Sequence, residues 1–226
     1  MRALAYLGLL VIPLLACDSE SVPPARSAAA PTTTLIVVPD GAGVPAAECN
    51  IKEGFFPGTG IEDREEWYGA HLSALGEHPL CLRPGAPDEV YRLTWLPSFH
   101  PSVIVRIDND SARYRLVAKV ESGAGGYDPG HLVRDTVLLL SNAERGELTG
   151  LLSASRFWRE PTTPPPYGRA GTDGAQWIIE GLAQRRYHVV DRWSPSRDGP
   201  DARLRQLAEW LLTKSGLAPA DLIHEY

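Results

Sequence analysis

The stretch VYRLTWLPSFHPSVIVRIDNDSARYRLVAKV, residues 90–120, decides the fold. In its first part Tyr91, Leu93 and Trp95 alternate with polar residues, a pattern typical of a strand with one buried face. Residues 103–107 are mostly β-branched and apolar, which favours a strand in the interior of a sheet. Strands spaced this closely along the chain are expected to pair antiparallel.

The flanking sequence extends this sheet and adds helices. A turn signal, Asp-Asn-Asp-Ser at 108–111, joins two of the strands as a hairpin. Further strands are expected over residues 132–140, 175–182 and 187–193, and helices over 62–76, 141–157 and 201–214. We therefore expect an α+β fold, with an antiparallel sheet of about six strands and about three helices, mainly on one face.

Two helix starts carry a capping-box pattern, Thr59-x-x-Glu62 and Ser141-x-x-Glu144. The apolar stripe expected on the first helix comprises Trp67, Ala70, His71, Ala74 and Leu75. His71 is interpreted as a hydrogen-bonded core residue rather than a ligand. Gly216 and Pro219 are expected to end the last helix.

The N-terminus has the order of an export signal. Arg2 precedes an apolar run over residues 4–15, and Leu-Leu-Ala-Cys occupies 14–17. This segment resembles a bacterial lipoprotein signal peptide, which implies cleavage before Cys17 and attachment of acyl chains such as palmitate to its sulfur. An ordinary signal peptide and a membrane anchor are the alternatives, although the run is shorter than the about 20 residues that span a bilayer.

The expected organisation is a signal peptide over 1–16, a lipidated tether over 17–34 and one α+β domain over 35–226. The Ser-, Pro- and Ala-rich composition of the tether offers little apolar surface to bury. In the exported domain, Cys49 and Cys81 are expected to form a disulfide, with two free thiols as the alternative.

The formal net charge is −6, from 22 Lys and Arg against 28 Asp and Glu, and it argues against a nucleic-acid partner. No zinc-ligand spacing accompanies the cysteines or the six histidines, so neither a metal nor a cofactor is expected. The glycine-rich segment 123–128 lacks the spacing of a phosphate-binding loop and is interpreted as a hairpin or bulge loop. No serine-hydrolase motif occurs.

The two late strands hold the remaining candidate chemistry. Alternation places Gln176, Ile178 and Glu180 on one face of their strand, and His188, Val190 and Arg192 on one face of the next. If the register brings Glu180 near Arg192, a bidentate ion pair forms beneath two tryptophans. Such a pair would hold an anionic or sugar ligand, or satisfy a buried polar network. The catalytic candidates are Asp173, Glu180 and His188, and the binding candidates are Arg92, Arg106, Trp177 and Arg192.

Several segments together resemble a family of uncharacterised, often exported bacterial proteins. The most specific are Asp173-Gly174-x-x-Trp177-x-x-Glu180 and Tyr187-His188-x-Val190-x-Arg192-Trp193-Ser194-Pro195. The supporting segments are residues 63–67, 71–77, 91–100, 105–106, 125–130 and 157–158. The similarity spans about residues 55–212 and implies a shared fold, but it assigns no reaction and no catalytic residue.

We expect a lipid-anchored cell-envelope protein with a binding or accessory role. Its expected partners are the membrane, through the anchor, and an envelope protein or a small polar ligand. The alternatives are an envelope hydrolase that uses Asp173, Glu180 and His188, with an arginine orienting the substrate, and an immunity or assembly module that binds another protein. No standard catalytic motif decides whether the protein is an enzyme.

Overall fold

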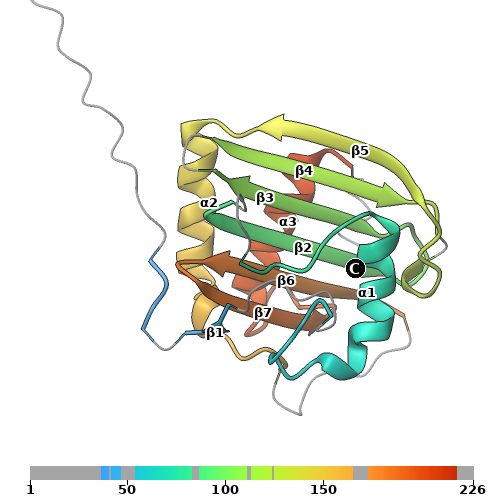
Figure 1. The fold of residues 1–226 in the computed structure, drawn as a ribbon, viewed down its shortest axis with the longest axis horizontal. Helices are drawn as coiled ribbons and strands as arrows, with labels where there is room; N and C mark the ends of the chain where they lie inside the picture. The colour runs from blue at the N-terminus through green and yellow to red at the C-terminus, as the bar shows by residue number, and fades with distance from the viewer. Residues whose placement is uncertain are drawn as a thin grey trace, which may run out of the picture. The chain divides into compact units, whose positions relative to one another are not determined.

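The computed structural model describes residues 37–40, 42–46, 54–82, 87–110, 113–123, 125–164 and 173–217 (Figure 1). The expected signal peptide and tether, with Cys17, and also Cys49 lie outside these ranges. Within them, no helix is long and apolar enough to cross a membrane.

A single antiparallel sheet of seven strands forms the centre of the domain, in the order β1-β7-β6-β2-β3-β4-β5. The strands are β1 (Val44–Pro45), β2 (Glu89–Pro97), β3 (Val103–Asn109), β4 (Tyr114–Glu121), β5 (Leu132–Leu139), β6 (Ala175–Ala183) and β7 (Arg186–Trp193). This confirms the predicted α+β class. The additional strand is the two-residue β1, which pairs with β7 and is too short to produce a period-two pattern.

The predicted hairpin is β3–β4, and β2 lies between β3 and β6. Every residue of β2 is buried, including the polar Arg92 and Thr94. The predicted alternation separates the two faces of the strand, and protein covers the sheet on both sides here, so the polar residues are enclosed as well.

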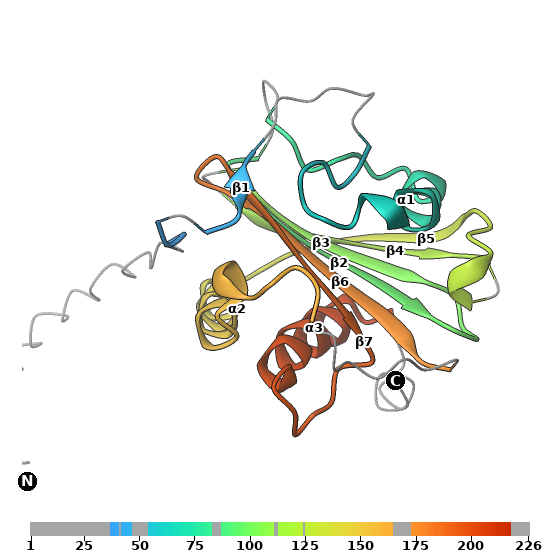
Figure 2. The same cartoon turned by 90° about the horizontal axis from the view of Figure 1, so that it is seen from below.

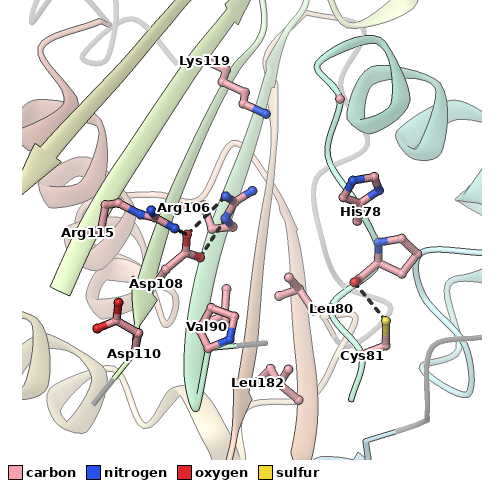
Figure 3. Close-up of a pocket in the computed structure, with 13 residues that line it drawn as sticks. His78, Leu80, Cys81, Val90, Arg106, Asp108, Asp110, Arg115, Lys119 and Leu182 are labelled. Carbon is pink, nitrogen blue, oxygen red and sulfur yellow. Dashed lines mark hydrogen bonds and ion pairs between the residues drawn. The ribbon is translucent and has the colours of Figure 1, made fainter. Parts of the chain in front are cut away.

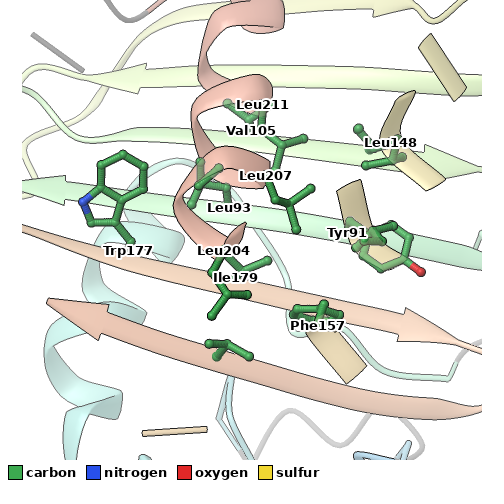
Figure 4. Packing of buried hydrophobic residues seen from close by; sticks show 14 of the residues in the cluster. Tyr91, Leu93, Val105, Leu148, Phe157, Trp177, Ile179, Leu204, Leu207 and Leu211 are labelled. Carbon is green, nitrogen blue, oxygen red and sulfur yellow. The ribbon is translucent and has the colours of Figure 1, made fainter. Parts of the chain in front are cut away.

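Helices cover both faces of the sheet (Figure 2). The helices α2 (Asn142–Ala154) and α3 (Ala202–Ser215) pack on one face, and α1 (Glu65–Ala74) packs on the other. The larger core lies under α2 and α3, where Leu204 and Leu207 meet apolar side chains of the central strands (Figure 4). The second core joins Tyr68 and Leu72 of α1 to the opposite side of the sheet. We call these sides the α2/α3 face and the α1 face.

Of the two predicted capping boxes, one is present in the structure and the other is not. Ser141 caps α2 with a complete capping box. Its side chain accepts a hydrogen bond from the Glu144 backbone N–H, and the Glu144 side chain accepts one from the Ser141 backbone N–H. Thr59 is not a cap: Glu62 accepts its N–H, but its hydroxyl donates to Phe56 O at 2.7 Å. A short 3₁₀ turn (η1, Glu62–Arg64) precedes α1 instead. Gly216 ends α3 with a φ of 64°, as predicted.

The buried stripe of α1 differs by about one position from the predicted stripe. It comprises Tyr68, His71, Leu72 and Leu75, whereas Ala70 is exposed. Tyr68 fixes this rotation, because its ring enters the core and its hydroxyl donates to Asp191 of β7 at 3.1 Å. His71 lies in the core as predicted, with Nδ1 2.6 Å from Glu121 Oε1.

The glycine-rich segment connects β4 to β5 through a 3₁₀ turn (η2, Gly125–Tyr127), as expected for a loop between antiparallel strands. Gly125 has a φ of 75°, and a Cβ there would lie 1.9 Å from Ser98 O. Only glycine fits this approach between the two loops.

Candidate functional site

Glu180 pairs with Arg92 and not with Arg192, so the register does not meet the condition for a Glu180–Arg192 pair. Arg92 lies directly opposite Glu180 across β2 and β6. Its Nε and Nη2 donate to the two carboxylate oxygens at 2.6 and 2.7 Å. Tyr187 donates a further hydrogen bond to Glu180 at 2.8 Å. All of these side chains are buried, so this arrangement satisfies a polar network inside the α1-face core.

Arg192 lies on the α2/α3 face, where its contacts hold chain segments together. Nε donates to Asp201 at 2.7 Å, at the start of α3. The other nitrogens donate to the carbonyl oxygens of Pro161 and Thr162, each at 3.0 Å. The guanidinium therefore fixes the loop before β6 against the beginning of α3.

The three catalytic candidates do not come together. Glu180 lies on the α1 face, whereas the ring of His188 packs on the α2/α3 face, 5.1 Å from the ring of Phe157. Asp173 is exposed ahead of β6. Because the sheet separates Glu180 from His188, the hydrolase alternative has no shared site for its acid and base.

Of the other binding candidates, Trp177 is a core residue and Arg106 reaches a cleft. Trp177 is 1% exposed, and its ring packs edge-on against Trp95, with the Arg205 guanidinium 5.1 Å from the ring centroid. Arg106 lies on β3 with 22% of its side chain exposed. Among the binding candidates, Arg106 is the one that lines this cleft.

The cleft has a volume of about 330 Å³ and opens on the α1 face (Figure 3). The loop after α1, residues 78–81, forms one wall. Charged side chains of the β3–β4 hairpin form the floor. They are Arg106, Asp108, Arg115 and Lys119. Asp110 lies at the rim, where its carboxylate accepts the Arg113 N–H at 3.0 Å and so stabilises the turn.

Glu77 anchors the cations beneath the cleft. Lys119 Nζ lies 2.8 Å from Glu77 Oε1, while Arg106 and Arg92 share Oε2. Burial disfavours the Glu77 carboxylate, but the charges of Arg92, Arg106 and Lys119 outweigh it and lower the pKa of Glu77 to about 2. Lys119 also donates to Leu75 O at 2.8 Å, at the end of α1. The carboxylate thereby fixes the position of each cation.

Asp108 holds two arginines in the same way. Arg106 contacts both of its oxygens, at 2.8 and 3.2 Å, and Arg115 contacts one at 3.2 Å. Burial opposes the charge of Arg106, yet the bonds to Asp108 and the charge of Glu77 raise the pKa of Arg106. Groups whose pKa values are displaced away from neutrality keep their charge near pH 7. They are therefore suited to holding a ligand rather than to transferring protons.

The acidic groups beneath the cleft are buried, whereas the basic groups are more exposed. The side chains of Glu77 and Asp108 are 1% and 6% exposed, whereas that of Arg115 is 53% exposed. Arg115 uses one guanidinium nitrogen on Asp108 and retains further N–H donors, since an arginine carries five. The floor therefore presents donors to the cleft, while the carboxylates of Glu77 and Asp108 are engaged by the cations; the exposed carboxylate of the lining is that of Asp110 at the rim.

Cys81 lies in the cleft wall, with its sulfur 3.3 Å from Pro79 O. Its expected disulfide partner, Cys49, is outside the described ranges. The bridge stays a prediction.

Sequence reasoning identified Arg106 and missed Arg115, Lys119, Asp108 and Glu77. A signal for the hairpin residues was present: if Tyr114, Leu116 and Ala118 face a core, Arg115 and Lys119 share the other face. No periodic signal marks Glu77, because it lies in the loop after a helix.

Neither a known family model nor a curated protein matches this sequence.

Proposed function

We propose that this chain is a lipid-anchored cell-envelope protein that binds a small acidic ligand, carrying a carboxylate or a phosphate, in the cleft on the α1 face. The observation that carries the proposal is the exposure of the cleft floor. The cations Arg106 and Arg115 reach the cleft, and the carboxylates that hold them are buried. The oxygens of an acidic ligand would accept charge-assisted hydrogen bonds from the free N–H donors of these arginines.

The cleft also limits the size of the ligand. Its volume of about 330 Å³ is at the lower end of the about 300–1,000 Å³ typical of small-molecule sites. Leu80 and Val90 contribute apolar surface to the lining. This combination favours a compact acid with a short apolar part.

Thermal unfolding of the purified full chain tests the ligand site. The probes are sodium phosphate, sodium citrate and uncharged glycerol, with sodium chloride added to equalise the ionic strength. An anion present at about 100 times its Kd stabilises the folded state by about 2.7 kcal/mol, so phosphate or citrate should raise the Tm and glycerol should not.

The matched variants are Arg115→Gln in the cleft and Arg203→Gln on the exposed side of α3. Arg115→Gln should fold normally, because its side chain is 53% exposed, and should lose the anion-induced rise. Arg203→Gln should keep it. The ligand proposal fails if neither anion raises the Tm, or if the rise persists in Arg115→Gln.

The anchor is tested separately by fractionation. Cys17→Ser removes the sulfur that the lipoprotein pattern designates for acylation. The domain should move from the membrane to the soluble fraction in cells that express this variant. Continued membrane association of Cys17→Ser would contradict the anchor without affecting the ligand proposal.

A further inference from the structure

β5 is the end strand of the sheet, and within the described part of the chain no strand pairs with its outer edge. Leu140 donates its N–H to Tyr114 O at 2.9 Å. In an antiparallel ladder this makes the even-numbered residues from Arg134 to Leu138 bond to β4, up to the register shift between Val120 and Glu121. The odd-numbered residues from Val133 to Leu139 therefore direct their N–H and C=O groups to the open edge, where they form a template for another strand.

The side chains of β5 are exposed on both faces of the sheet. The exposed fractions are 40% for Leu132, 56% for Val133, 56% for Val137, 41% for Leu138 and 64% for Leu139. Single exposed apolar residues are common, but this many on one open strand form a patch of the kind that marks an interaction surface. The charged residues of the strand, Arg134 and Asp135, lie near its middle.

We infer that β5 pairs antiparallel with β5 of a second copy, around a twofold axis at Thr136, so that the sheet continues from one protomer into the other. A twofold axis normal to the sheet keeps the α1 faces of both copies on one side. Directly opposed residues must then point to the same face of the sheet. Because side chains alternate along each strand, the two residue numbers of every opposed pair must add up to an even number. The axis consequently passes through a single residue of the strand.

The charges and the strand length select that residue. An axis at Arg134 or Asp135 would place like charges directly opposite each other, which destabilises a sheet. An axis at Val137 would oppose Val133 with Ser141, the cap of α2, and would lose pairing at both ends. An axis at Thr136 pairs every residue from Val133 to Leu139.

The register at Thr136 is self-complementary, which favours a second copy over a different partner. Val133 then lies opposite Leu139 of the partner copy, which buries apolar surface. Thr136 lies opposite itself, and Thr–Thr pairs stabilise sheets through hydrogen bonds. The outward N–H and C=O groups of the opposed odd residues form reciprocal hydrogen bonds. A lipid tether would add to this by confining the copies to one membrane surface and raising their effective concentration.

Two variants at one position test the register. In this register Val137 lies opposite Asp135 of the other copy. Val137→Asp creates a like-charge pair, whereas Val137→Lys creates an attractive pair with the same loss of apolar surface. Sedimentation of the full chain should give about twice the monomer mass of 24.6 kDa for wild type and Val137→Lys, and the monomer mass for Val137→Asp. A cooperative thermal transition in each protein shows that all three fold.

Cysteine pairs locate the axis independently of stability. Residues opposed at a non-hydrogen-bonded position have Cα atoms about 4.5 Å apart, within the about 4.4–6.8 Å of a disulfide. Thr136→Cys should therefore give a reducible dimer above the wild-type background. The two copies of residue 137 lie on a diagonal about 7–8 Å apart, so Val137→Cys should not.

Each contrary outcome overturns the inference. It fails if wild type is a monomer at every concentration, if a different protein occupies β5, or if Val137→Asp remains a dimer. Equal dissociation of Val137→Asp and Val137→Lys would show that apolar area alone joins the copies, and would exclude the Thr136 register. Efficient crosslinking at residue 137 instead of 136 would do the same.

Discussion

Arg92 and Glu180 face each other on neighbouring strands and share two hydrogen bonds, of 2.6 and 2.7 Å, in the interior of the domain. Both side chains are 0% exposed. Charges removed from water to this degree persist only when each compensates the other. The pair lies beneath the cleft, because Arg92 also contacts Glu77, and it connects the core to the charged floor.

Removing one partner of this pair should destabilise the domain severely. Arg92→Met or Glu180→Leu removes the bidentate partner of the remaining buried charge, at an expected cost of about 3–5 kcal/mol. The double variant should cost less than the sum of the two. Urea unfolding in a double-mutant cycle measures this, and additive effects would contradict a coupled pair.

Low pH should destabilise the folded domain, because Glu77 becomes protonated. Its pKa is about 2 in the folded chain, against an ordinary value of 4.5. Because the folded value is lower, the stabilisation is complete above pH 4.5 and is lost as the pH falls towards 2. The free energy of unfolding should fall by about 3 kcal/mol in total over this range.

Urea unfolding across this range checks the assignment to Glu77. Glu77→Gln should be less stable at neutral pH and should lose less stability over the same interval. The exposed α1 variant Glu66→Gln is the matched control. An identical pH dependence in wild type and Glu77→Gln would show that another group is responsible.

His188 should add a separate loss of stability at milder acidity. Burial lowers the pKa of His188 below its ordinary 6.5, and its ring packs against the rings of Phe157 and Trp158. Below pH 6.5 the unfolded chain binds a proton that the folded chain resists, so stability falls. Tm values at pH 7.5 and 5.5 should differ less in His188→Gln than in wild type or in the exposed His78→Gln. A full wild-type decrease in His188→Gln would refute this.

Two glycines should respond to alanine in opposite directions. A Cβ on Gly181 of β6 would lie 2.6 Å from Phe157 Cε1, so Gly181→Ala overpacks the core and should cost about 1–3 kcal/mol. Gly146 of α2 has nothing within 4 Å of its Cβ position. Gly146→Ala should stabilise by up to about 1 kcal/mol, through helix propensity. Calorimetric Tm shifts of the same sign would contradict the packing described for Gly181.

Local patterns predicted the elements well, because strand alternation and helix caps depend on neighbouring residues. The partner of Glu180 depends on register. Gln184 and Arg185 form the β6–β7 turn with φ values of 50° and 59°, and neither is the glycine or asparagine that usually signals such a turn. That turn places Glu180 opposite Val189, so Arg192 points to the other face.

The cleft depends on contacts between distant segments, which periodicity does not encode. Glu77 meets Arg106 across 29 positions of the chain, and the pair forms only because α1 packs on β3 and β4. The alternation of the hairpin indicated which side Arg115 occupies. It contained no information about the loop that turns this side into a cleft.

Isothermal titration of citrate into wild type and Arg115→Gln, in parallel at one ionic strength, tests acid binding in the cleft most directly. A hydrogen bond to a charged group contributes about 1.5–3 kcal/mol, so the variant should bind about 10- to 100-fold more weakly while its Tm without ligand stays at the wild-type value. Equal dissociation constants for the two proteins, or no heat of binding to wild type, would contradict a site formed by Arg115 and Arg106.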